Sequence, residues 1–149
     1  MKRKGQAAVE FLMTYGWAIL AAVIAIGVLA YFGVFSPGKY APSATVVNPP
    51  FYVVGGTAVV DASAASVAVE IRNNGGEDLI VSQMNVDNCN PDSTAQNLTA
   101  SQSGVFTATG CTGITAGETF RGDMSILYTR EGGLLNLTST GTITQQAVA

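Results

Sequence analysis

The chain has 149 residues, with seven Lys or Arg, ten Asp or Glu, two Cys and no His, and its formal net charge is −3. The length fits one modest domain, and 11% charged against 48% hydrophobic residues excludes a strongly charged disordered chain. Few basic residues follow Lys39, so no basic stripe is available for phosphate groups and nucleic-acid binding is not expected. Because His is absent and no nucleophile and base pairing or phosphate loop is recognisable, we expect neither an enzyme nor a cofactor or metal site.

An uncharged, mostly apolar stretch occupies residues 11–38. As a helix its first 25 or so residues would cover roughly 37 Å, against about 30 Å for the hydrocarbon core of a bilayer. Three basic residues, Lys2, Arg3 and Lys4, precede the stretch. Basic residues stay on the cytoplasmic side, so the sequence predicts a membrane-spanning helix with everything after Tyr40 outside the cell.

Three hypotheses account for this segment. A secretory signal peptide has the basic start, but its apolar region is usually shorter and is followed by a small-residue cleavage site that is not seen here. A plain membrane anchor fits the length and the charge. The third hypothesis depends on the junction between the basic residues and the apolar stretch, which reads KRKG-QAAVEF.

That junction resembles an archaeal type IV pilin precursor with a class III signal peptide, which is cut before the apolar segment. The resemblance covers roughly the first 35 residues and implies a leader of residues 1–5 and prepilin peptidase cleavage between Gly5 and Gln6. Glu10 then stands fifth in the mature chain, where the family carries its glutamate. The sequence departs from the family pattern at Ala8 and Thr14. These departures put the assignment to a particular subfamily in doubt. An archaellin is disfavoured, since its glycine-rich start is missing.

Glu10 has a physical role in this hypothesis. A carboxylate in the centre of a membrane helix costs about 2.5 kcal/mol or more, so it is an odd residue for a passive anchor. After cleavage, the free amine of Gln6 in one subunit can compensate Glu10 of a neighbour within a bundle of helices. The alternative is that Glu10 lies among the headgroups and is merely solvated.

The rest of the chain has the pattern of a β domain. Pro37 and Gly38 end the helix, so we expect a helix over residues 6–35, a linker over 36–44 and an extracellular domain over 45–149. Hydrophobic alternation predicts seven strands, near residues 44–48, 51–60, 66–72, 79–86, 104–109, 119–129 and 134–145. The expected fold class is α+β, a long hydrophobic helix followed by an antiparallel β-sandwich with immunoglobulin-like topology as the candidate.

The alternation also predicts which side chains face the core. The expected inward rows are Val67, Val69 and Ile71; Ile80, Ser82, Met84 and Val86; Met124, Ile126 and Tyr128; and Leu135, Leu137, Ser139, Gly141 and Ile143.

Cys89 and Cys111 both fall in the expected external domain, where a disulfide is the natural interpretation and would stabilise by roughly 3 kcal/mol. A metal held by two Cys without His is disfavoured. Calcium is a second alternative for the polar cluster around residues 87–92 (Asp87, Asn88, Asn90 and Asp92), although these are also ordinary turn residues. Asn97 and Asn136 each begin an N-x-T sequence and are expected N-glycosylation sites if the domain is exported.

The resemblance implies a structural subunit of an extracellular filament that serves adhesion or surface attachment. Its expected partners are further copies of the chain in a helical homopolymer, a prepilin peptidase, an assembly ATPase with its membrane platform protein, and the membrane before assembly. The alternative is a monomeric, membrane-anchored β-sandwich that binds a sugar, protein or solute outside the cell.

Overall fold

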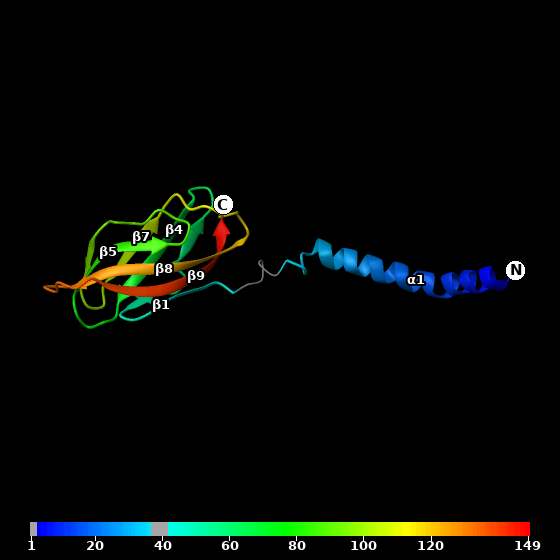
Figure 1. Cartoon of the computed structure of the whole chain (residues 1–149), viewed down its shortest axis with the longest axis horizontal. Helices are drawn as coiled ribbons and strands as arrows, with labels where there is room; N and C mark the ends of the chain where they lie inside the picture. Colours follow the sequence, from blue (N-terminus) through cyan, green and yellow to red (C-terminus); the bar gives the residue numbers. More distant parts are fainter. Residues whose placement is uncertain (1–2, 37–41) are drawn as a thin grey trace. The chain divides into compact units, whose positions relative to one another are not determined.

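A computed structural model of the chain describes residues 3–36 and 42–149, which form two compact units, a helix and a β domain (Figure 1). Lys2 and most of the expected linker lie outside the described residues, and Arg3 and Lys4 are described only through their backbone. The fold class is therefore α+β, as the sequence predicts. The two units are considered separately below.

Helix α1 (Arg3–Tyr31) is the whole of the first unit's regular structure. It begins within the expected leader and ends four residues before the expected limit at residue 35. The end is a Schellman motif, in which Gly33 has a φ of 73° and the N–H of Val34 donates to the carbonyl of Leu29 at 3.1 Å. Glycine tolerates this left-handed conformation without strain, so Gly33 and not Pro37 stops the helix.

The β domain contains nine strands. They are β1 (Ala44–Val47), β2 (Phe51–Val53), β3 (Val59–Asp61), β4 (Ser66–Asn73), β5 (Leu79–Val86), β6 (Gln96–Leu98), β7 (Ser103–Ala108), β8 (Thr119–Arg130) and β9 (Leu137–Val148). Six of the expected strands correspond to single observed ones. The expected strand over residues 51–60 is instead two strands separated by a Gly55-Gly56 turn, and β6 was not expected because its segment is mostly polar.

The strands form one continuous sheet in the order β2-β4-β3-β9-β8-β5-β6, with β1 also paired to β9 and β7 to β4 (Figure 1). All pairs are antiparallel except β3 and β9, in which Val60 lies beside Ala147. Both β2 and β3 pair with one edge of β4, because β7 occupies the other edge. The sheet thus curls into a half-barrel, and the immunoglobulin-like sandwich is not confirmed.

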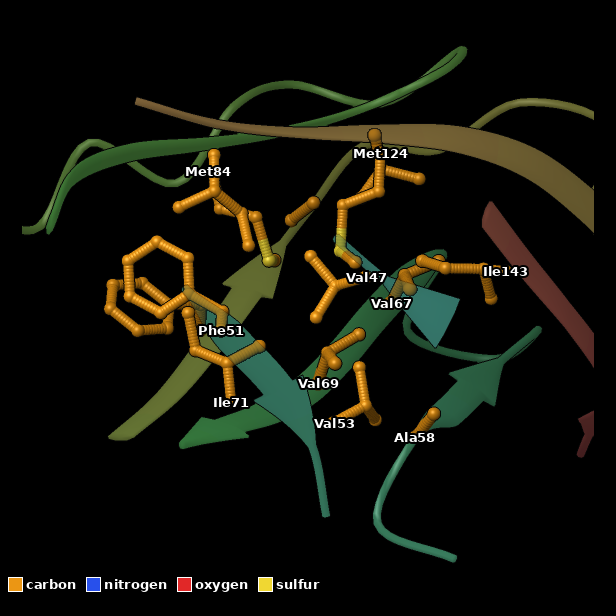
Figure 2. Packing of buried hydrophobic residues seen from close by; sticks show 14 of the residues in the cluster. Val47, Phe51, Val53, Ala58, Val67, Val69, Ile71, Met84, Met124 and Ile143 are labelled. Atoms are coloured by element: carbon orange, nitrogen blue, oxygen red, sulfur yellow. The ribbon is translucent and has the colours of Figure 1, made fainter. Parts of the chain in front are cut away.

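The concave side of the sheet holds the core (Figure 2). Val67, Val69 and Ile71 of β4 are fully buried, and the predicted row of β8, from Met124 to Tyr128, is buried as well. Side chains from strands on either side of β9 therefore pack into one apolar cluster, as Figure 2 shows for Val69 of β4 and Met124 of β8. Removing this much apolar surface from water is the main stabilising term of such a domain.

The predicted inward row of β5 is half wrong. Met84 and Val86 are buried as expected, but their buried partners are Leu79 and Val81, not Ile80 and Ser82. The register with β8 shifts between Val81 and Gln83. A β-bulge adds one residue to the strand, and one added residue moves every later side chain to the opposite face.

Strand β9 follows its predicted row only in part. Ser139 and Ile143 are buried, whereas Leu135 precedes the strand and is 75% exposed. Gly141 faces the core where β1 crosses closely, since a Cβ there would lie 2.9 Å from the Cα of Val47. The glycine therefore permits the close approach of β1 to β9.

Candidate functional site

The residues expected to direct processing and assembly lie together in the first turns of α1. Gly5, Gln6 and Glu10 are all exposed, and nothing lies within 4 Å of a Cβ placed on Gly5. Gln6 and Glu10 are four residues apart, so their side chains share one face of the helix. Thr14 continues that face, and its hydroxyl donates to the carbonyl of Glu10 at 2.9 Å. The Thr14 hydroxyl is thus hydrogen-bonded within its own apolar helix, and this bond does not involve the side-chain carboxylate of Glu10.

The remainder of α1 presents apolar side chains in every direction. Residues 5–31 are long and apolar enough to cross a membrane, judged by length and composition, and none of this window is buried. Phe11 and Tyr15 stack against each other with ring centroids 4.8 Å apart, and Trp17 is 71% exposed. A helix that is apolar all round needs lipid or other protein around it. The helix taken by itself therefore carries a large apolar surface on every side.

In the β domain, Cys89 and Cys111 form the expected disulfide. Cys89 follows β5 and Cys111 follows β7. The bond therefore joins two arms of the curled sheet, one that contains β5 and one that contains β4 and β7. The N–H of Cys111 also donates to the carbonyl of Ala65, at the β3–β4 turn, at 2.9 Å. An isolated bridge between Asn90 and Thr109 lies beside the disulfide. The covalent bond and these hydrogen bonds close the side of the half-barrel that no strand pairing closes.

Removal of the disulfide is expected to destabilise the β domain. In a Cys89→Ala, Cys111→Ala double variant, the unfolded chain loses a crosslink between residues 22 apart in sequence. The chain-entropy estimate for a loop of this size is about 3 kcal/mol. Urea unfolding of the oxidised and double-variant proteins measures the difference. The disulfide has no such stabilising role if the two midpoints agree and the slopes are equal.

Asp92 joins the same two arms through hydrogen bonds. Its backbone pairs with Met84 of β5, at 2.8 and 2.9 Å. One carboxylate oxygen accepts the N–H of Thr94 at 2.9 Å and the other accepts the N–H of Thr107, in β7, at 2.8 Å. Both carboxylate oxygens therefore bind backbone donors, which accounts for this acid in the polar cluster without a calcium ion. The neighbouring Gln96 side chain donates to the carbonyl of Val105 and covers the same edge of β7.

The Asp92 contacts make the stability of the domain depend on pH. Burial acts to raise the pKa of Asp92, but hydrogen bonds from Thr107 and Thr94 outweigh it, and the pKa lies below its usual value of 3.8. Because the folded state binds this proton less readily than the unfolded state, the stabilisation is complete above about pH 5 and is lost as pH falls through the lowered pKa. The free energy of unfolding should therefore fall between pH 5 and pH 3.

Asp92→Asn tests this dependence. We expect a loss of about 1 kcal/mol at pH 7, since an amide replaces one of two charge-assisted acceptors, and a smaller further loss toward pH 3 than in the unchanged protein. Asp61 is the matched control, because the Ser63 hydroxyl and nearby backbone N–H groups also lower its pKa while its side chain lies in an exposed turn. Chemical unfolding at each pH measures both. Equal pH slopes in Asp92→Asn and the unchanged protein would contradict the assignment.

Asn73 is the polar residue whose importance the sequence did not reveal. Its sequence context, Asn-Asn-Gly-Gly, is typical of a turn, but Asn73 ends β4 and is fully buried. Its side-chain amide donates to the carbonyls of Glu77 at 2.6 Å and Leu98 at 2.8 Å, and its side-chain oxygen accepts the N–H of Gly75 at 2.9 Å. One side chain thus holds the β4–β5 turn and the end of β6 together. Nothing in this sequence context distinguishes the buried Asn73 from the exposed Asn74 beside it.

Both expected glycosylation sites are accessible. Asn97 is exposed in β6, where its strand neighbour Leu98 is buried, and the Thr99 hydroxyl donates to the Gln102 side chain at 3.0 Å. Asn136 is exposed just before β9, and not within the strand as expected. The two asparagines therefore meet the steric requirement for modification, which itself stays a prediction.

Comparisons of the sequence with protein-family models and with curated proteins found no match.

Proposed function

We propose that this chain is a structural subunit of an extracellular filament of the archaeal type IV pilus kind. The observation that carries the proposal is the combination of the Gly5-Gln6 junction and Glu10 with a helix whose apolar surface is exposed on all sides. Such a surface requires a continuous partner along its whole length. A bundle of identical helices supplies that partner and also supplies an amine for each Glu10.

In this proposal the precursor sits in the membrane with its N terminus in the cytoplasm. A prepilin peptidase cuts after Gly5, and an assembly ATPase with its platform protein moves the subunits out of the bilayer. The α1 helices then exchange lipid for helix contacts in the filament core, where the glycines and alanines permit close approach. The β domains form the outer wall, and the filament serves adhesion or surface attachment.

The disulfide supports the exported placement of the β domain. A disulfide between the ends of two strands is typical of proteins folded in an oxidising compartment.

The charge of the chain is consistent with cleavage followed by removal from the membrane. Removal of residues 1–5 takes away three of the seven basic residues, and with them the signal that keeps the N terminus inside. A chain that is to leave the membrane does not need that signal after processing.

A monomeric, membrane-anchored binding domain is the second candidate. It is favoured by a groove at one end of the β domain, lined by Pro49, Pro50, Tyr52 and Tyr128 among others. The Tyr52 ring is 58% exposed there, and an exposed aromatic ring in a groove suits a small or extended ligand. In this candidate the helix stays in the bilayer and the leader stays on the chain.

Amino-terminal sequencing of material sheared from cells that express the chain separates the two candidates. We expect Gln6 as the first residue of a polymeric fraction that sediments after shearing. The intact precursor, treated with detergent, is the matched control and begins with Met1. Full-length monomers that are released by detergent and never by shearing would contradict the filament and favour the anchored domain.

A further inference from the structure

The β8–β9 hairpin ends in two exposed leucines. Leu134 is 99% exposed and Leu135 is 75% exposed, within a loop whose remaining residues are two glycines and two polar residues. We call residues 131–136 the leucine tip; it is the orange end of the hairpin in Figure 1. Isolated exposed leucines are common, but two adjacent ones at a projecting loop end form a surface that is unfavourable in water.

The base of the leucine tip is fixed while its end projects. The N–H of Gly133 donates to the carbonyl of Arg130 at 2.8 Å, and the N–H of Glu131 donates to the carbonyl of Asp78 at 3.0 Å. Gly132 has a φ of 75°, which a larger residue would adopt only with strain. These bonds hold the turn against the β4–β5 turn and direct Leu134 and Leu135 away from the domain.

The leucine tip lies at the end of the β domain opposite to the end where the chain enters. The chain enters at Ala44, which is paired with Thr144, while β9 begins at Leu137. Seven residues of strand separate these positions, or about 23 Å at roughly 3.3 Å per residue. The tip is therefore separated from the entry of the chain by the length of the β domain.

The charges around the tip restrict its partner. The tip itself contains Glu131, and Glu77 and Asp78 lie in the neighbouring β4–β5 turn. The nearby Arg130 is already paired with Glu77 at 3.3 Å. The β domain as a whole (residues 42–149) carries nine acidic and three basic residues. An anionic lipid, or a second copy that meets this tip with its own, would therefore be repelled. Two leucines also cover far less than the roughly 800 Å² per partner of a stable protein interface.

We propose that the leucine tip inserts into a lipid surface that carries no net charge. Leucine side chains enter the boundary between headgroups and acyl chains, and the acidic residues behind them remain in water. One tip binds weakly, but many tips on one filament or one membrane bind together, which multiplies the affinity without new contacts. The inference deepens the proposed function by naming the surface to which the protein attaches, although the experiment below needs no filament.

The test uses the full chain reconstituted through α1 into donor vesicles, with Trp17→Phe to remove the single tryptophan and Leu134→Trp to place an indole at the tip. Target vesicles of phosphatidylcholine carry bromine on their acyl chains, which quenches tryptophan fluorescence on contact. We expect quenching by brominated targets and none by unbrominated ones. The same targets with an added anionic lipid should quench less. Absence of quenching by the brominated phosphatidylcholine overturns the proposal.

A second measurement uses co-flotation of donor and target vesicles. The chain in this measurement keeps its own Trp17 and carries no tryptophan at position 134. The Leu134→Ser, Leu135→Ser double variant should float with phosphatidylcholine targets at least tenfold less than the unchanged chain. Val105→Ser is the matched control, since Val105 is 55% exposed on β7, and should float normally. Donor vesicles that associate with one another without targets would show a second copy as the partner and overturn the proposal. Equal flotation of the double variant and the control would do the same. Failure of either measurement leaves the filament untouched, because its test is the processed N terminus.

Discussion

Glu10→Gln is expected to reduce filament yield at least a hundredfold while leaving the β domain as stable as before. The change removes the charge but keeps the shape, so in the proposed filament the amine of Gln6 in a neighbouring subunit would lose its partner inside the helix bundle. Breaking a buried ion pair from one side costs about 3–5 kcal/mol, because the remaining charge is uncompensated. Glu10 lies in α1, which belongs to a compact unit separate from the β domain. Filament yield is measured by shearing, sedimentation and electron microscopy.

The matched control for Glu10 is Glu118→Gln, which removes one exposed carboxylate from the β domain and should assemble normally. Glu10→Asp is a graded variant that keeps the charge one methylene shorter, and we expect reduced but detectable assembly. Normal filaments from Glu10→Gln would show that the carboxylate is merely solvated near the headgroups. Loss of filaments in Glu118→Gln as well would indicate a general dependence on surface charge.

Much of the fold follows from local pattern. The long strands β4, β5 and β8 lie within one residue of their expected limits, and helix α1 lies within four residues of its own, because alternation and helix length are properties of adjacent residues. The closure of the sheet does not follow from local pattern. It depends on the pairing of Val60 with Ala147, which are far apart in sequence, and on the Gly55-Gly56 turn that frees β3 for it. A two-sheet sandwich was the expected answer because nothing in the alternation distinguishes it from one curled sheet.

The inward rows failed where the backbone departs from regular geometry. Ile80 and Ser82 were assigned to the core because the period of two was continued through the bulge next to Gln83. Leu135 was assigned to the core because the period of two was continued back from Leu137, yet it lies in the loop before β9. A bulge and a loop boundary each depend on the partner strand, which the sequence of a single strand does not contain.

The candidate site was predictable to the same extent. Gly5, Gln6 and Glu10 form a short motif and could be read directly, and the pair Cys89 and Cys111 had no other partner to choose from. The contacts of Asp92 and Asn73 could not be predicted, because each joins segments that meet only after the sheet has curled. In sequence, a short polar side chain whose hydrogen bonds stabilise the fold cannot be distinguished from one that is exposed in a turn.

Asn73→Ala is expected to lower the free energy of unfolding by about 3 kcal/mol, although the sequence presents Asn73 as an ordinary turn residue. The side chain is fully buried, and its removal leaves the carbonyls of Glu77 and Leu98 and the N–H of Gly75 without this partner. Each buried polar group left unsatisfied costs about 1–3 kcal/mol, reduced where water can enter. Chemical unfolding of the full chain in detergent, followed by far-ultraviolet circular dichroism of the β signal, measures the change.

Asn73→Asp separates hydrogen bonding from packing, since it keeps the shape of the side chain. A carboxylate cannot donate, so it would face the carbonyl oxygens of Glu77 and Leu98 with a negative charge, and we expect a loss of about 4 kcal/mol at pH 7. Lowering the pH should restore part of that loss, because the protonated acid can again donate once. The adjacent Asn74 is exposed and makes Asn74→Asp the matched control, with an expected change within about 0.5 kcal/mol. If both aspartate variants were equally stable, the buried amide would fill space without bonding, and the end of β6 would have to be held by the packing of Leu98 alone.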